Sequence, residues 1–234
     1  MKIINWNCNG AFRKKFESLD SMDADVLVIQ ECENPAESKD KKYKDWASNC
    51  LWIGDSKNKG LGIFAKDSID IKPLDWSSLY QGHKIKHFLP CLLNEEIQLL
   101  AVWNHHNNSP NFGYIGQLWK YLQVNKQNFT EPFIIGDFNS NAIWDEWDRW
   151  WNHTDVVNEL LEKEIESLYH TIFNEEQGKE TSPTFYLQRN PLKSYHIDYC
   201  FAHSKYSSKI KSFIIEPFEN WNHLSDHCPI IISF

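Results

Sequence analysis

Residues 134–141 read Ile-Ile-Gly-Asp-Phe-Asn-Ser-Asn and follow directly on Phe133. A short apolar run of this kind is typical of a buried strand. Because strand side chains alternate between the two faces, Asp137 and Asn139 would lie on the same face if the extended conformation continues past Gly136. A carboxylate and a carboxamide at the mouth of a core strand can hold a water molecule or a metal-bound oxygen. Taken alone, however, the stretch favours an ordinary turn, since Gly, Asp, Asn and Ser are the usual turn formers.

The composition indicates a single domain spanning residues 1–234. Of the 234 residues, 41% are hydrophobic and 24% are charged, which suffices for a sizeable core. The formal net charge of −8 argues against binding polyanions through net charge alone, so a nucleic-acid ligand would need a local basic surface or metal ions. Neither a signal peptide nor an apolar run of membrane-spanning length is evident, which predicts a cytoplasmic protein, and we expect a monomer. The six cysteines include no CxxC pair, so we expect reduced thiols rather than a zinc site.

Apolar runs predict a domain of many strands with a few helices. Strands are expected over residues 2–8, 25–31, 51–53, 60–65, 69–74, 87–93, 97–103, 133–139, 183–187, 194–202, 210–217 and 230–234. Helices are expected over residues 116–126 and 156–170. Trp144, Trp147 and Trp151 also recur at helical spacing, which favours a helix facing the core; the alternative is an aromatic platform on which nucleobases stack.

Polar residues stand where several of these strands end. They are Asn7, Glu31, the polar cluster at 104–108 that includes His105, Asp137 with Asn139, and Asp226 with His227, while Asp198 lies within a further strand. Such residues, although distant in the sequence, converge when their strands share a sheet edge. The pattern therefore predicts one site built from many segments.

The types of these residues indicate phosphate chemistry. Asn7, Glu31 and Asp226 offer hard oxygen ligands, which suit Mg²⁺ or Mn²⁺ better than zinc. His227 with Asp198 has the logic of an imidazole oriented by a carboxylate. We further expect that Asp137 and Asn139 orient an attacking water, and that His105 donates to a non-bridging phosphate oxygen.

An ordered set of motifs resembles the endonuclease/exonuclease/phosphatase superfamily over residues 3–234. The motifs are Trp6-Asn7, Gln30-Glu31, Asn104-His105, Gly136-Asp137-Phe138-Asn139, Ile197-Asp198-Tyr199 and Ser225-Asp226-His227. The resemblance implies an α/β fold, a four-layer sandwich of two facing mixed β-sheets flanked by helices, with the site at one edge. It also implies that Asn7, Glu31 and Asp226 belong to the metal site and that His227, Asp198, Asp137, Asn139 and His105 are catalytic. His227 would act either as general base or as a cation that stabilises the phosphate.

Two departures weaken an assignment to the abasic-site endonucleases. Asn9 stands where the DNA-repair branch usually has Asp, and Asn104-His105 is closer to the branch with a Thr-His pair. The leading interpretation is a Mg²⁺-dependent phosphodiesterase (with Mn²⁺ as a substitute) that hydrolyses nucleic acid, with DNA favoured over RNA. Asn9, Arg13 and Lys14 are expected to contact this substrate. The alternative is a phosphatase or phosphodiesterase for a small or lipid-linked phosphoester, and a binding protein on a catalytically dead scaffold is disfavoured by the complete set of motifs.

Overall fold

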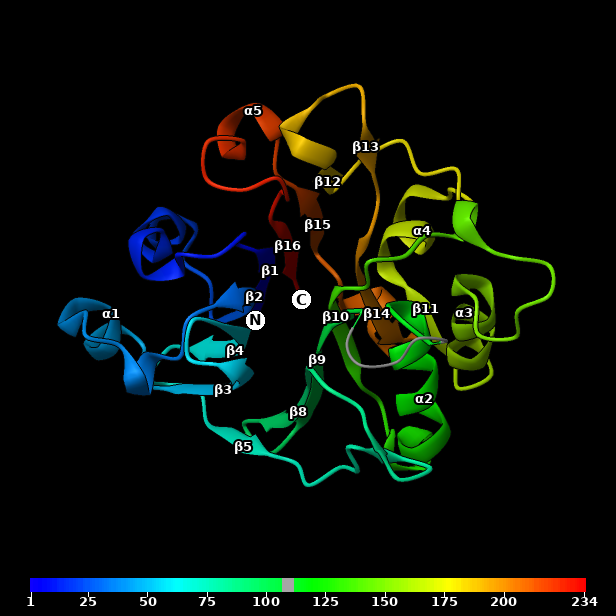
Figure 1. The fold of residues 1–234 in the computed structure, drawn as a ribbon, viewed down its shortest axis with the longest axis horizontal. Helices are drawn as coiled ribbons and strands as arrows, with labels where there is room; N and C mark the ends of the chain where they lie inside the picture. Colours follow the sequence, from blue (N-terminus) through cyan, green and yellow to red (C-terminus); the bar gives the residue numbers. More distant parts are fainter. Residues whose placement is uncertain (107–111) are drawn as a thin grey trace.

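The structure is a computed structural model that describes residues 1–106 and 112–234. Two six-stranded mixed sheets dominate it (Figure 1). Sheet A has the order β15 (Ser212–Ile215), β16 (Ile230–Ser233), β1 (Lys2–Asn7), β2 (Val26–Cys32), β4 (Lys59–Ala65) and β3 (Cys50–Ser56). Sheet B has the order β11 (Ile165–Ser167), β14 (Asp198–His203), β10 (Phe133–Asp137), β9 (Ile97–Trp103), β8 (Phe88–Leu93) and β5 (Ile71–Pro73). Within each sheet one neighbouring pair, β1 with β2 and β9 with β10, runs parallel.

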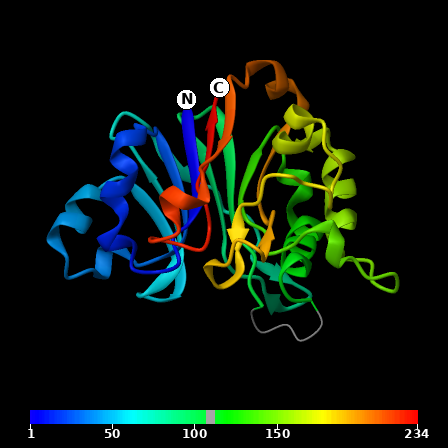
Figure 2. The same ribbon diagram turned by 90° about the horizontal axis from the view of Figure 1, so that it is seen from above.

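Helical segments cover the outer faces of the two sheets, so that the molecule has four layers (Figure 2). The α-helices are α1 (Lys41–Trp46), α2 (Ile115–Asn125), α3 (His153–Leu161), α4 (Leu168–Phe173) and α5 (Phe218–Trp221). Two small separate sheets have two strands each: β6 (Leu79–Tyr80) with β7 (His83–Lys84), and β12 (Phe185–Tyr186) with β13 (Ser194–Tyr195). The predicted four-layer sandwich is confirmed.

Strand β10 shows why the apolar runs were informative. Phe133 and Ile135 belong to the core between the two sheets, whereas Ile134 belongs to the core between sheet B and helices α2 and α3. A strand buried on both faces needs an unbroken apolar run. At its end, a Cβ on Gly136 would lie 1.8 Å from the carbonyl oxygen of Val102 on β9, so only glycine fits there.

The prediction of a core-facing helix around the tryptophans is wrong. Within residues 142–151, only Ala142–Trp144 forms a short 3₁₀ turn, and the side chain of Trp147 is 95% exposed. The helix begins instead at His153, because Asn152 and Asp155 form a capping box there. Of the three spaced tryptophans, Trp151 does pack partly against the core.

The helix predicted over residues 156–170 is also interrupted. Helix α3 ends at Leu161, and Glu164 adopts a left-handed φ of 57°. Ile165 then pairs with His203 on β14, so this segment adds a strand to the edge of sheet B before α4 begins. The expected pair of strands 183–187 and 194–202 likewise divides, since only Ser194–Tyr195 pairs with β12 and β14 joins sheet B.

The cysteines and the apolar helices were also the subject of predictions. All six cysteines lie in the described parts of the chain and are free thiols, and all except Cys50 are buried. Across residues 1–106 and 112–234, no helix combines the length and apolar character that a membrane span requires.

Candidate active site

The two sheets bring most of the predicted site residues to one edge. In sheet B, Asp137 at the end of β10 is the register partner of Asp198 at the start of β14. Asn104, which directly follows β9, donates its backbone N–H to the carbonyl oxygen of Asp137 over 2.9 Å. In sheet A, Asn7 and Gln30 are register partners at the ends of β1 and β2, so that Glu31 follows beside Asn7.

Asp137 joins the two halves of this edge. Its buried carboxylate accepts the side-chain amide of Asn7 on sheet A at 2.9 Å and the side-chain amide of Asn139 at 2.9 Å. It also accepts the backbone N–H of Asn139 at 2.8 Å, which fixes the left-handed turn (φ 46°) at that residue. Burial, and secondly the charge of Asp198, raise the pKa of Asp137 to about 7.

His227 and Asp198 form a buried pair. Nδ1 of His227 lies 2.9 Å from Oδ2 of Asp198, and both side chains are buried. Burial alone lowers the pKa of His227, but the Asp198 carboxylate outweighs it, with Asp137 adding to the effect, and the pKa rises to about 9. The imidazole therefore carries its second proton at neutral pH, with Nε2 turned away from Asp198.

The surrounding chain fixes both members of the pair. The hydroxyl of Thr184 accepts the backbone N–H groups of Ile197 and Asp198, each at 3.0 Å. The ring of Phe185 packs against His227 with 4.6 Å between centroids. The indole N–H of Trp6 donates to the carbonyl oxygen of His227 at 3.0 Å, which ties the segment before β16 to β1.

The sheet A half has a different character. Glu31 sits at a β-bulge between Gln30 and Cys32, with a left-handed φ of 64°, and the bulge turns its carboxylate toward the rim. There it forms an ion pair with Lys59, the first residue of β4, at 2.8 Å. Asp226 is half-buried on the segment before β16, and the preceding Ser225 donates its hydroxyl to the carbonyl oxygen of Asn7 at 2.7 Å.

His105 lies at the exposed rim next to Lys59. Its ring stands edge-on to Trp103, 5.1 Å between centroids, and the ammonium of Lys59 lies 5.8 Å from the same Trp103 ring. Partial burial, and secondly the charge of Lys59, lower the pKa of His105. Asn107 and Asn108 of the predicted polar cluster lie outside the described residues.

The three predicted substrate-binding residues occupy the loop after β1. Asn9 is exposed, has a left-handed φ of 52°, and donates its backbone N–H to the side chain of Asn7 at 3.0 Å. The guanidinium of Arg13 forms an ion pair with the buried carboxylate of Glu33, so part of its charge is already neutralised. Lys14 is exposed to solvent.

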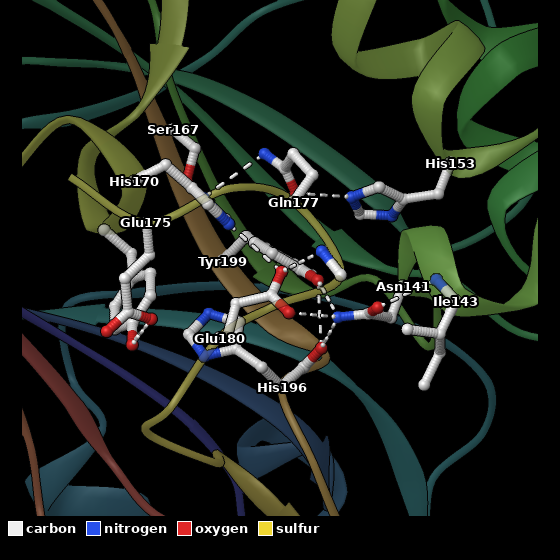
Figure 3. A network of polar contacts seen from close by, with 12 residues as sticks. Asn141, Ile143, His153, Ser167, His170, Glu175, Gln177, Glu180, His196 and Tyr199 are labelled. Atoms are coloured by element: carbon white, nitrogen blue, oxygen red, sulfur yellow. Dashed lines mark hydrogen bonds and ion pairs between the residues drawn. The ribbon is translucent and has the colours of Figure 1, made fainter. Parts of the chain in front are cut away.

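A buried polar network supports the loop that carries Asn139 (Figure 3). The side-chain amide of Asn141 donates to Glu180 at 3.0 Å, to the carbonyl oxygen of His196 at 3.0 Å and to the hydroxyl of Tyr199 at 3.1 Å. The other oxygen of Glu180 lies 3.0 Å from Nε2 of His170. Although burial opposes ionisation, these hydrogen bonds lower the pKa of Glu180 to about 2. The network thereby connects the segment after β10 to the segment that leads into Asp198.

Comparisons with known proteins show the family and the fold of this chain. The sequence model of the endonuclease/exonuclease/phosphatase family matches residues 4–227. The chain belongs to this family. No curated protein sequence matches it.

Solved structures of distant relatives show the same fold. The 3′ phosphatase NExo from Neisseria, bound to a product DNA hairpin, has a TM-score of 0.73 at 18% identity, covering 100% of this chain and 99% of that one. An AP endonuclease from Archaeoglobus fulgidus has a TM-score of 0.73 at 15% identity, with coverage of 100% and 99%. TDP2 from D. rerio, complexed with a single-strand DNA product, has a TM-score of 0.67 at 17% identity, with coverage of 99% and 97%.

The donor set of this family member fits a hard divalent cation. Glu31 already faces a positive charge, the ammonium of Lys59. Asp226, next to the Ser225 that bonds Asn7, adds a carboxylate, and Asn7 adds an amide oxygen that also accepts the backbone N–H of Asn9. A second acidic group, Asp137, Asp198 and His227, has one ligand atom each within 4.8 Å. In that group, however, Nδ1 of His227 and Oδ2 of Asp198 are used by each other. One oxygen there, Oδ1 of Asp198, is buried and has no hydrogen-bond partner among the described residues.

The sequence pattern predicts no role in the site for Lys59, Thr184 or Phe185. Lys59 reaches the site only because the bulge at Glu31 brings that carboxylate against the start of β4. Thr184 and Phe185 come from a hairpin whose position is fixed by long-range contacts, including an isolated bridge between Phe185 and His227. The sole sequence signal was the apolar pair Phe185-Tyr186 shortly before the Ile197-Asp198-Tyr199 motif.

Proposed function

We propose that this protein is a Mg²⁺-dependent phosphodiesterase that hydrolyses phosphodiester bonds of nucleic acid, and that DNA is its substrate. The observation that carries the proposal is the buried, hydrogen-bonded His227–Asp198 pair beside the buried Asp137–Asn139–Asn7 cluster. A cationic donor next to a fixed carboxylate is an arrangement suited to a phosphate that is attacked by water.

Each residue has a role that follows from its surroundings. Asp137 is held by three hydrogen bonds, so its carboxylate and the neighbouring Asn139 amide align the attacking water with the phosphorus. His227 retains its proton at neutral pH, which supports stabilisation of charge on the phosphate rather than general-base catalysis. His105, at the rim, binds a non-bridging oxygen.

Asn7, Glu31 and Asp226 would hold the Mg²⁺. The ion, when bound, neutralises negative charge on the phosphate oxygens. Exchange of Lys59 for this ion at Glu31 would free the ammonium to bind the substrate phosphate nearby.

A basic hollow supports a polymeric substrate. A cavity of about 230 Å³ beside the loop after β1 is lined by Arg13, Lys39 and Lys57 together with Glu33 and Glu37. It joins Arg13, on the loop after β1, to Lys39, which lies just before α1. Local positive charge of this kind offsets the acidic net charge where a phosphate backbone would lie. The NExo and TDP2 structures, in which the protein is bound to DNA products, favour DNA. Action as a cytoplasmic monomer stays a prediction.

The test is hydrolysis by the purified protein with Mg²⁺, with Mn²⁺ and in chelator. Substrates are single-stranded DNA, duplex DNA with an abasic site, RNA and small phosphomonoesters. We expect metal-dependent cleavage of DNA, reduced about 10²- to 10⁴-fold in His227→Ala and similarly in Asp137→Ala. Glu31→Gln serves as a variant of the metal set. Release of phosphate from small molecules, with every polynucleotide left intact, would contradict the proposal and favour the phosphatase alternative.

A further inference from the structure

The tryptophan-rich loop between Asn141 and α3 presents large aromatic side chains to solvent. Trp147 is 95% exposed, Trp150 64% and Trp144 44%. The burial of one tryptophan is worth several kcal/mol, so three exposed ones in a seven-residue stretch call for a partner.

The loop holds these side chains in a defined shape. The side-chain amide of Asn152 donates to the carbonyl oxygens of Glu146 (3.0 Å) and Arg149 (2.9 Å), and its oxygen accepts the backbone N–H of Glu146 at 3.0 Å. The carboxylate of Asp145 accepts the backbone N–H groups at the start of α3. Trp147 lies between Glu146 and Arg149, whose backbone groups are both held by Asn152, so the loop itself keeps the Trp147 side chain exposed.

A cavity connects this loop to the candidate active site. It has a volume of about 410 Å³ and is lined by Tyr114, Asn139, Ser140, Trp144, Arg149 and Trp151, among others. This volume lies within the range of small-molecule sites, about 300–1,000 Å³. Asn139 is the residue whose amide bonds Asp137, so a group in the cavity lies next to the phosphate position.

The lining matches the chemistry of a nucleobase. Tyr114 and Trp144 are 45% and 44% exposed, and the guanidinium of Arg149 stacks over Trp151 at 4.4 Å from the ring centroid. Aromatic rings and a stacked guanidinium are the groups on which proteins stack unpaired bases. His153 at the same cavity is kept neutral, since burial lowers its pKa to about 4.

The charges favour a base over a phosphate. Among the described residues, Arg149 is the one lysine or arginine in the cavity lining, and Asp145 lies in the same lining. The exposed acids Glu146 and Asp148 flank Trp147 on the loop. Negative groups here repel a phosphate backbone but not an uncharged ring, and they leave the backbone to the basic hollow near Arg13.

We propose that this cavity, the base subsite, binds the unstacked nucleobase that neighbours the scissile phosphate, and that the enzyme therefore acts on single-stranded or frayed ends in preference to intact duplex. The inference rests on the proposed nuclease function and narrows its substrate. A base can enter the cavity only after it has left the helical stack, which a single strand permits at low cost.

The test measures binding and hydrolysis separately. A single-stranded oligonucleotide carrying 2-aminopurine is titrated in chelator with His227→Ala protein that does or does not also carry Trp144→Ala. We expect quenching of the 2-aminopurine by the parent, and about 5- to 150-fold weaker binding after loss of the ring. Trp144→Phe should restore most of the affinity. Tyr114→Ala provides a second variant in the lining of the cavity. Ile214→Ala, an exposed apolar residue on β15, is the control for lost surface hydrophobicity.

Hydrolysis of an oligonucleotide of tetrahydrofuran abasic residues, which has the phosphodiester bonds but no aromatic ring, provides the second readout. We expect Trp144→Ala in the otherwise wild-type protein to retain this hydrolysis and to lose activity on single-stranded DNA. Unaltered binding and cleavage of single-stranded DNA by both the Trp144→Ala and the Tyr114→Ala variants would overturn the base subsite while leaving the nuclease function in place. Failure of the wild-type protein to cleave any polynucleotide would instead remove the proposed function, and the subsite with it.

Discussion

The two halves of the candidate site differ in how firmly the protein itself holds them. In the sheet B half, Asp137 and Asp198 are fully buried and hydrogen-bonded, and the pair with His227 is closed at 2.9 Å. In the sheet A half, the side chain of Glu31 is 17% exposed and its partner Lys59 is 51% exposed. The first half is fixed by the fold, whereas in the second half the carboxylate of Glu31 is held by one ion pair at the rim.

This difference indicates a division of labour. Groups that align the water and the phosphate gain from a fixed geometry, because any reorganisation during the reaction adds to the barrier. A cation site must instead exchange its occupant, and a rim carboxylate with a mobile ammonium partner can do so. The predictions below test whether the two halves differ in this way.

The largest effect is expected from opening the buried pair. Asp198→Asn leaves the His227 imidazolium without its counter-ion and should destabilise the fold by about 3–5 kcal/mol near neutral pH. Since the pKa of His227 is raised from 6.5 to about 9, the stabilising contribution of its charge is complete below pH 6.5 and is lost as the pH rises through 9. The difference between wild type and variant should therefore shrink over this interval.

Urea unfolding in chelator, followed by tryptophan fluorescence below pH 6.5 and above pH 9, measures it. Glu176→Gln, which changes an exposed carboxylate paired with Lys179, is the control and should show little pH dependence in this range. A difference for Asp198→Asn that stays constant with pH would show that His227 is not charged in the folded protein.

An intermediate effect is expected at the rim. Glu31→Gln removes a charged ligand and should weaken Mn²⁺ binding by at least about tenfold, while Lys59→Met removes the competing ammonium and should tighten it. Isothermal titration without substrate measures both. Unchanged affinity in Glu31→Gln would place the ion instead at the Asp137, Asp198 and His227 cluster and would break the proposed division.

The sequence predicts the sheet B half of the site better than the sheet A half. Asp137 and Asn139 follow a strand buried on both faces, so the apolar run itself marks where the strand ends and the polar edge begins. The partner of Glu31 depends on a bulge and on the register of β4, which arise from pairing across the sheet and leave no local pattern. The helix predicted from the tryptophan spacing is absent because the capping box of Asn152 and Asp155 sets the start of the helix at His153.

The smallest effect on stability is expected at Glu180, in the polar network next to the sheet B half. Glu180→Gln retains the shape of the side chain but places an amide where Asn141, His170 and the backbone N–H of Gly178 all approach as donors. We expect a loss of about 1–2 kcal/mol in the free energy of unfolding at neutral pH. Because the pKa of Glu180 is lowered from 4.5 to about 2, its contribution to stability is present above pH 4.5 and is lost as the pH falls toward 2. The destabilisation caused by Glu180→Gln should therefore diminish in acid.

Urea unfolding at neutral and acidic pH measures this destabilisation, with Glu176→Gln, an exposed carboxylate paired with Lys179, as the matched control. If Glu180→Gln and Glu176→Gln unfold alike, the network does not brace the Asn139 loop, and the rigidity of the sheet B half rests on the hydrogen bonds of Asp137 and Asp198 alone.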